Sequence, residues 1–237
     1  MSQILIFTDG AAKGNPGPGG YGAVVVENGK VMEIGEGKSE TTNNEMELKA
    51  VVEALKVLSV QGSKVAIYTD SKYVVEGAQG WVFGWMKNGW KTKAKTDVLH
   101  KGLWQELVDL QKNFDIEWHK VPGHAGLIGN ERADSIASDF GDRKNVELYH
   151  GELSEYGIDI ENVSYDEEEA KRRSEARARQ SAKAYSYVSM VDGEIQTHQT
   201  WAECHARVDG KKARFKKALT EEEEREIIES YKKEAGT

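Results

Sequence analysis

Apolar residues along the first 140 positions alternate and cluster in a pattern that predicts strands and helices in a definite order. An apolar run at Gln3–Phe7 precedes a Gly/Pro loop, and Tyr21–Glu27 and Lys30–Glu36 have the character of strands. The dipeptide Asn28-Gly29 between them is a strong hairpin signal. We therefore predict that the chain opens with an antiparallel meander of three strands.

Helical and extended patterns alternate after the meander. The N-cap candidates from Thr41 to Asn44 precede apolar residues spaced for one helix face, namely Leu48, Val51, Val52, Leu55 and Leu58. Two further strands are predicted, at Lys64–Thr69 and Asp115–Val121. Three further helices are predicted, at Ser71–Gly77, Val98–Leu110 and Asn130–Phe140. This order of elements predicts an α/β fold, a mixed sheet with helices packed on it.

The pattern changes twice in the last hundred residues. Regular periodicity lapses near Asp142, and residues 166–183 hold five acidic and six basic residues, which predicts a solvated helix or a linker. A hairpin about Asp192-Gly193, a short helix with Trp201, a basic strand and a helix at Thr220–Tyr231 follow. We therefore expect three parts: a domain at 1–142, a charged linker or helix at 143–183, and a small α+β domain at 184–232.

Composition narrows the class of protein. The chain has 237 residues, 38% of them hydrophobic, and no apolar run near the roughly 20 residues that a membrane helix needs. Asp9 interrupts the first apolar run before a secretory leader could form. The single cysteine, Cys204, excludes an intramolecular disulfide and a multi-cysteine zinc site. We expect a cytoplasmic protein that has no membrane contact and no obligate protein partner, and that is a monomer.

Charge is spread unevenly, although the net charge is -8. Between Gly80 and Lys101 there are five lysines and one acid, and between Gly210 and Lys217 there are five basic residues and no acid. Such local patches matter to a nucleic acid, because screening confines the field of a charge to about 10 Å at ordinary salt. The overall acidity therefore does not exclude a nucleic-acid partner.

Four carboxylates are candidates for one site. Asp9 and Asp70 each follow the apolar part of a strand, Glu47 borders the buried stripe of a helix, and Asp134 lies three residues after Glu131 on another helix. Taken singly, each acid is better explained as a cap, a turn residue or a surface charge. Together they would repel one another unless cations neutralised them. Oxygen ligands without cysteine or paired histidine favour Mg²⁺ or Mn²⁺, and two such ions about 4 Å apart suit phosphodiester hydrolysis.

Several motifs in a fixed order carry a resemblance to a known family. They are FTDGA (Phe7 to Ala11), GNPGPGGYGAV (Gly14 to Val24), TTNNEMELKA (Thr41 to Ala50), YTDSKYV (Tyr68 to Val74), GWKT (Gly89 to Thr92), and VPGHAG followed by NERAD (Val121 to Asp134). With these motifs, Gln3 to Gly141 closely resembles the type 1 ribonuclease H family. The resemblance implies the ribonuclease H-like fold, with a mixed five-stranded sheet and helices on both faces.

The resemblance also implies an activity and its residues. The activity is endonucleolytic hydrolysis of the RNA strand of an RNA–DNA hybrid by two Mg²⁺ or Mn²⁺ ions, leaving 5'-phosphate ends. The family's metal ligands correspond to Asp9, Glu47, Asp70 and Asp134, and its histidine that helps product release or proton movement corresponds to His124. Expected contacts to the hybrid fall on Gly10, Asn15, Thr42, Asn43, Asn44 and Ser71, with Thr42 and Asn15 resembling a pocket for a DNA-strand phosphate. Thr42 to Asn44 could equally be a helix cap, and both roles can coexist.

The segment from Trp81 to Lys95 interleaves tryptophans with lysines and resembles the family's basic protrusion, which grips the DNA strand. Its expected hybrid contacts are Trp81, Trp85, Lys87, Trp90, Lys91, Thr92, Lys93 and Lys95. The tryptophans could instead form a buried helical face, and at least one is expected to do so. The lysines are too polar for a core.

The segment from Tyr185 to Tyr231 resembles the small hybrid-binding, viroplasmin-like domain that is often attached at the N-terminus of eukaryotic ribonuclease H. Its place after the catalytic domain departs from that arrangement. The residues expected to stack or contact phosphates are Tyr187, Trp201, Lys211, Lys212, Arg214, Phe215 and Lys216, with Lys217 as a further base. The alternative is a module for oligomerisation or stability. As a hybrid-binding domain it would raise affinity by tethering.

Two rival functions remain open. One is a non-catalytic hybrid-binding protein that kept the fold, which the intact set of four carboxylates disfavours. The other is a relative of reverse transcriptase or integrase, which the PGHAG motif, the protrusion and the absence of a polymerase portion disfavour. Cleavage of a hybrid separates the first from an enzyme, and cleavage of duplex DNA would favour the second.

Overall fold

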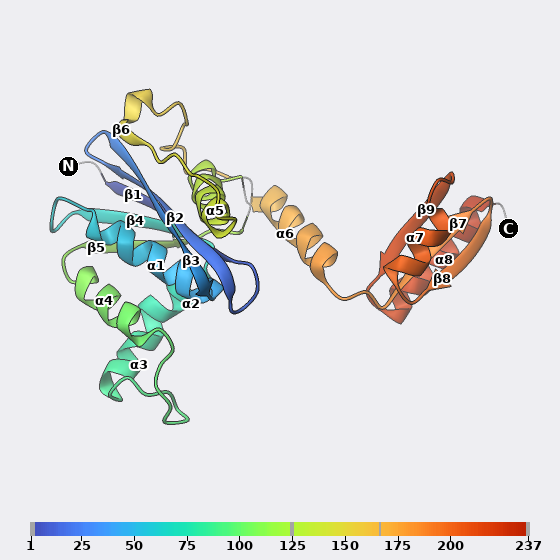
Figure 1. The fold of residues 1–237 in the computed structure, drawn as a ribbon, viewed down its shortest axis with the longest axis horizontal. Coiled ribbons are helices and arrows are strands. Elements are labelled where there is room, and N and C mark those ends of the chain that lie inside the picture. Colours follow the sequence, from blue (N-terminus) through green and yellow to red (C-terminus); the bar gives the residue numbers. More distant parts are fainter. Residues whose placement is uncertain (1–2, 124–125, 166, 236–237) are drawn as a thin grey trace. The chain divides into compact units, whose positions relative to one another are not determined.

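The computed structural model describes residues 3–123, 126–165 and 167–235 and divides the chain into two compact units, between Ser174 and Glu175. Figure 1 shows the elements of both units. The first unit contains β1 (Ile4–Ala12), β2 (Gly17–Glu27), β3 (Lys30–Thr41), α1 (Asn43–Lys56), β4 (Lys64–Thr69), α2 (Lys72–Glu76), the π-helical turn η1 (Gly77–Trp81), α3 (Val82–Lys87), α4 (Lys101–Gln111), β5 (Asp115–Lys120), α5 (Ile128–Gly141), β6 (His150–Glu152) and the 3₁₀ turn η2 (Leu153–Glu155). The helix α6 (Glu167–Ser181) runs across the division.

The sheet of the first unit is mixed, as the order of elements predicts. Its strand order is β5-β4-β1-β2-β3-β6, with β1, β4 and β5 parallel and the meander β1-β2-β3 antiparallel. The expectation of five strands was wrong, because β6 adds a sixth beside β3. A strand of three residues is too short to show an alternating pattern in the sequence.

Helices cover both faces of this sheet, and the alternation along β1 shows why. Ile4 and Ile6 pack in one buried cluster with residues of α1 and α4, whereas Phe7 packs in another with residues of α5. Successive side chains of a strand point to opposite faces, so a nearly continuous apolar strand is buried on both sides. The expected arrangement of helices on both faces is confirmed.

Part of the range 143–183 packs on the first unit. Tyr156 and Ile160 are buried in the cluster that contains Phe7, and β6 pairs with β3. The charged stretch that follows was predicted to be a solvated helix or a linker. It forms the helix α6. The division between the units therefore falls inside this range, within α6.

The second unit is a three-stranded antiparallel sheet with two helices. Its elements are β7 (Ser186–Val191), β8 (Glu194–His198), α7 (Trp201–Val208), β9 (Ala213–Ala218) and α8 (Glu221–Ala235), with strand order β8-β7-β9. Val188 of β7 packs with residues of α8, while Val191 packs with residues of α7, so the helices lie on opposite faces. The expected small α+β domain is confirmed as a fold. No helix in the described parts of the chain is long and apolar enough to span a bilayer.

Candidate active site

The parallel pairing of β1 and β4 brings two of the four candidate carboxylates together. Thr8 of β1 is in register with Thr69 of β4. The next residue along each chain segment is Asp9, still in β1, and Asp70, just after β4. Asp9 lies inside β1, paired with Gly22 of β2, rather than just beyond the strand as the sequence suggests. Both acids therefore lie at the same edge of the sheet, where α/β proteins commonly place their functional groups.

Gly10 lets α1 approach this edge. A Cβ atom on Gly10 would lie 2.1 Å from the backbone nitrogen of Glu47, so only glycine fits between β1 and the helix. This close approach carries Glu47 to the edge of the sheet beside Asp9. Gly10 was expected to contact the hybrid, and the structure shows in addition that it allows α1 to pack closely on β1.

The Glu47 carboxylate is held by two hydrogen bonds. The Ser71 hydroxyl donates to Oε2 over 2.5 Å, and the Asn43 amide donates to Oε1 over 2.7 Å. Ser71 is also the N-cap of α2, because its Oγ accepts the backbone N–H of Val74. Two residues that the sequence analysis assigned to hybrid contacts thus orient an acidic residue of the candidate site.

Asp134 and the loop after β5 complete this edge. Asp134 lies on α5, where its Oδ1 accepts a hydrogen bond from the Ser138 hydroxyl at 3.3 Å. A Cβ atom on Gly123 would lie 2.7 Å from Oδ2 of Asp70, so the loop passes directly over that carboxylate. His124, the next residue and a predicted catalytic residue, lies outside the described residues.

Burial and mutual repulsion act together on the central carboxylate. Burial, followed by the charges of Asp70 and Asp134 and to a smaller extent Glu47, raises the pKa of Asp9 well above its usual range. The backbone N–H of Gly10 opposes this by donating to Oδ1 at 2.7 Å. The pKa of Glu47 is raised as well, by burial and then by Asp70, against the hydrogen bonds from Ser71 and Asn43. The structure therefore brings all four predicted carboxylates into electrostatic contact.

Such a site fits divalent cations by its donor chemistry. All four groups are carboxylates, and like charges gathered around a buried acid are stabilised by a cation that neutralises them. Among the described residues, no three His, Cys, Asp or Glu side chains already form a metal cage.

A second group of predicted residues lies at the N-terminus of α1. Thr42 is its N-cap, with Oγ1 accepting the backbone N–H of Glu45 at 3.2 Å, and Asn44 is exposed in the first turn. Asn15 is exposed in the loop between β1 and β2, two residues before Gly17, which pairs with Thr41. The β2–β3 pairing therefore brings the Asn15 loop to the strand end that leads into Thr42.

The predicted protrusion comprises α3 and the segment that leads to α4 (Figure 1). Its tryptophans form a chain of ring contacts: Trp81 lies 5.9 Å from Trp85, which lies 6.5 Å from Trp90 and 5.5 Å from Trp104. Trp85 and Trp90 pack against the buried cluster of α1 and α4, whereas Trp81 is exposed. Trp85 and Trp90 are thus partly buried, and Trp90 lies beyond the end of α3 rather than on a helical face.

The polar residues of the protrusion face solvent. Lys87, Lys93 and Lys95 are exposed, Lys91 donates to Asp97 at 2.7 Å, and Thr92 is bonded to Thr96 in a turn. The apolar side chains of Phe83 and Met86 on α3 are exposed too. These two residues were not predicted from the sequence to be part of the binding surface, although their position close to Lys87 was a signal for it.

The second unit carries an aromatic cluster, defined here as Tyr187, Trp201, His205 and Phe215. The Trp201 ring lies within 5.2–5.6 Å of the other three rings, and Trp201 and Phe215 are 42% and 49% exposed. The predicted bases Lys211, Lys212 and Lys216 are exposed. Arg214 instead pairs with Glu234 and lies over the ring of Tyr231, on the face covered by α8.

One buried ionic group escaped the sequence analysis. Glu33 of β3 is fully buried and accepts two hydrogen bonds from Arg132 of α5, at 2.6 and 2.8 Å. It also accepts the Tyr149 backbone N–H and the Tyr156 hydroxyl. The sequence signal was a charged residue at a position of β3 where the alternation set by Val31 calls for an apolar one.

The known proteins to which this chain is similar are described as ribonucleases H. The family model described as RNase H matches residues 1–140. A ribonuclease H of Cupriavidus metallidurans is 52% identical over 138 residues, covering 58% of this chain and 94% of the relative. A ribonuclease H of Brucella anthropi is 46% identical over 154 residues, covering 62% and 99%. The crystal structure of LC9-RNase H1, described as a type 1 RNase H with the type 2 active-site motif, superposes with a TM-score of 0.56 at 29% identity, covering 67% of this chain and 82% of that one.

Proposed function

This chain belongs to the RNase H family, and from that premise we propose that it is an endonuclease that hydrolyses the RNA strand of RNA–DNA hybrids. The observation that carries the proposal is the crowding of Asp70, Asp134 and Glu47 around the buried Asp9. A protein that only bound hybrids would have no use for repelling carboxylates in a buried position. Relatives with about half of their residues identical are named as ribonucleases H.

The four carboxylates would hold two Mg²⁺ or Mn²⁺ ions. When bound, such ions activate a water molecule and stabilise the leaving oxygen of an in-line displacement. The oxygen of water then bonds to phosphorus and the bond to the 3'-oxygen breaks, so the products carry 5'-phosphate and 3'-hydroxyl ends. The chain's own contribution is position: Ser71 and Asn43 fix the Glu47 carboxylate, and Gly10 fixes α1 against β1. His124 is proposed to assist product release or proton movement.

Recognition of the hybrid is assigned to the surface beside the carboxylates. Asn15, Thr42, Asn43 and Asn44 would contact the two backbones, with Thr42 and Asn15 taking a DNA-strand phosphate. Amides and hydroxyls suit 2'-hydroxyls and phosphate oxygens as partners. Trp81 and the exposed lysines of the protrusion would hold the DNA strand further along, while Trp85 and Trp90 support them from the core side.

We further propose that the second unit is a hybrid-binding module and that the chain is organised as a catalytic domain at 1–142, a segment at 143–183 whose first part packs on that domain and whose charged part connects it to the module, and this module at 184–232. The support is the aromatic cluster, whose exposed rings could stack on sugars or bases, together with the exposed lysines of the same unit. Two linked sites on one hybrid gain from effective concentration. The module would therefore raise affinity without taking part in the chemistry.

Replacing Trp201 tests the module in the full chain. We expect Trp201→Ala to weaken hybrid binding about tenfold, because stacking on an aromatic side chain contributes roughly 1–3 kcal/mol per base. The Michaelis constant should rise, while the single-turnover rate at saturating hybrid stays within about twofold. Trp201→Phe keeps a stacking surface and should restore most of the affinity. An affinity unchanged by Trp201→Ala would contradict a binding role for the cluster.

Cleavage of an end-labelled hybrid tests the proposed function directly. The full chain with Mg²⁺ or Mn²⁺ should cut the RNA strand internally, leave the DNA strand intact, and stop when EDTA is added. The new 5' ends should accept a label from a kinase only after phosphatase treatment. Duplex DNA of the same sequence serves as the control, and its cleavage would favour an integrase-like enzyme instead.

A further inference from the structure

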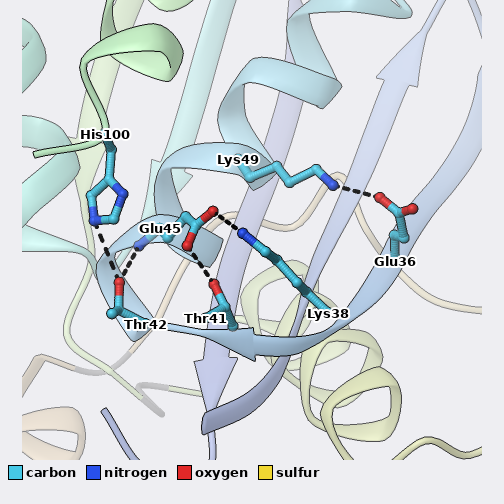
Figure 2. Close-up of polar contacts among 7 residues, drawn as sticks. All are labelled: Glu36, Lys38, Thr41, Thr42, Glu45, Lys49 and His100. Atoms are coloured by element: carbon cyan, nitrogen blue, oxygen red, sulfur yellow. Dashed lines mark hydrogen bonds and ion pairs between the residues drawn. The ribbon is translucent and has the colours of Figure 1, made fainter. Parts of the chain in front are cut away.

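His100, which the proposed function does not use, lies against the residue proposed to take a DNA-strand phosphate. Its Nε2 atom is 3.4 Å from Oγ1 of Thr42, as Figure 2 shows. His100 precedes α4 and has a left-handed backbone conformation, with φ of 55°, which few residues other than glycine adopt. Both His100 and Thr42 are partly exposed, so a ligand can reach them.

The Thr42 hydroxyl can donate only one hydrogen bond. Its oxygen already accepts the backbone N–H of Glu45, and it has one hydrogen to donate. A neutral His100 can accept that hydrogen through a bare Nε2, which leaves none for a ligand. A charged His100 has no acceptor and can only donate, so Thr42 keeps its hydrogen for another partner.

The charged groups that act on the His100 ring come from two neighbouring elements. Burial lowers the pKa of His100, Glu45 of α1 raises it, and Lys38 of β3 lowers it. The Glu45 carboxylate is itself paired with a cation, because it accepts a hydrogen bond from Lys38 at 2.5 Å. It also accepts one from the Thr41 hydroxyl at 2.8 Å (Figure 2). Lys101 adjoins His100 in sequence and adds a further positive charge. At neutral pH the free protein therefore holds an uncharged ring beside Thr42.

We propose that protonation of His100 controls how tightly Thr42 holds a DNA-strand phosphate, so that the affinity for the hybrid rises as the pH falls. The inference rests on the proposed function, in which Thr42 is a phosphate contact. A phosphate beside the ring favours the charged form, so binding of the hybrid takes up a proton. The charged ring frees the Thr42 hydrogen for the phosphate and adds a favourable charge.

Hybrid binding by the full chain, measured by fluorescence anisotropy in EDTA between pH 5.5 and 8.0, tests this inference. As the pH falls from 8.0 to 5.5, the dissociation constant of the wild type should fall at least about tenfold more than that of His100→Gln, which corresponds to one hydrogen bond gained with a charged group. Other titrating groups are common to both proteins, so the difference isolates His100. His150→Gln, which removes an exposed histidine of β6 that lies in none of the proposed binding surfaces, should keep the wild-type dependence.

Two further variants keep the test specific to Thr42. Thr42→Ser retains the hydroxyl and should preserve the pH dependence, whereas Thr42→Asn retains an N-cap but not the hydroxyl and should lose it. Equal pH dependence in the wild type and His100→Gln would overturn the inference. Failure of the proposed function looks different, because the protein would then cleave no hybrid at any pH.

Discussion

Asp9→Asn is expected to lower the rate of hybrid cleavage by a factor on the order of a thousand or more. The replacement removes the negative charge of a proposed metal ligand at the centre of the carboxylate cluster, and a thousandfold loss corresponds to about 4 kcal/mol of transition-state stabilisation. Single-turnover cleavage with saturating Mg²⁺ measures the effect. Asp115→Asn is the matched control, since Asp115 is exposed at the start of β5 and should behave as the wild type.

The same replacement should stabilise the metal-free protein. The folded state raises the pKa of Asp9, so its charged form is unfavourable there, and the cost is fully present above the raised pKa. Asparagine removes that charge while its side-chain oxygen can still accept from Gly10. We expect the free energy of unfolding in EDTA at pH 7 to be higher for Asp9→Asn than for the wild type. The gain should shrink as the pH falls below the raised pKa and vanish below the unfolded pKa, about 3.9, where Asp9 is protonated in both states. A variant with lost activity and lost stability would indicate misfolding instead.

Glu33→Ala is expected to reduce the free energy of unfolding of the first unit by about 1–3 kcal/mol, because it leaves the partly exposed Arg132 cation and the buried Tyr156 hydroxyl without their acceptor. Five of the six tryptophans lie in this unit, so fluorescence during denaturant unfolding follows it. Glu36→Ala is the control on the same strand. Its exposed pair with Lys49 at 2.5 Å (Figure 2) should contribute less than about 1 kcal/mol.

The contribution of Glu33 should depend on pH in a defined direction. Burial alone would raise its pKa, but the hydrogen bonds from Arg132, Tyr156 and the Tyr149 backbone outweigh burial and lower it. A carboxyl group with a lowered pKa stabilises the fold above its unfolded pKa, about 4.3, and loses that effect as the pH falls through the folded value. The difference between the wild type and Glu33→Ala should therefore narrow in acid. A constant difference across that range would contradict the ionic role.

The sequence predicts the carboxylate site well because each of its acids is tied to a strong local pattern. Asp9 and Asp70 follow apolar stretches that form neighbouring parallel strands, and Glu47 borders the apolar stripe of α1. What the pattern could not show is that Asp9 lies within β1, because the strand continues through polar and small residues to Ala12. From the sequence, Ser71 and Asn43 were predicted to contact the hybrid rather than to donate hydrogen bonds to Glu47, because both residue types suit substrate contacts equally well.

The features that the sequence misses depend on contacts between distant positions. Glu33 and Arg132 are 99 residues apart, and each looks like an ordinary surface charge until α5 packs on β3. The strand β6 has only three residues and exists because the edge of β3 offers it hydrogen-bond partners. His100 lies beside Thr42 only because the loop before α4 returns to the start of α1. Tertiary packing decides all three.

Some cations of the second unit are paired within the unit, and this pairing affects how strongly its proposed binding surface depends on ionic strength. Arg214 is paired with Glu234, and Lys217 donates to the carbonyl oxygens of Arg179 and Ala182, so these cations are already engaged within the unit. Lys211, Lys212 and Lys216 stay exposed and would release counterions on contact with phosphates, as the lysines of the protrusion would, whereas stacking on the aromatic cluster releases few. As salt rises, the lysine contacts of both surfaces should weaken first, and the aromatic cluster would keep the hybrid tethered to the enzyme.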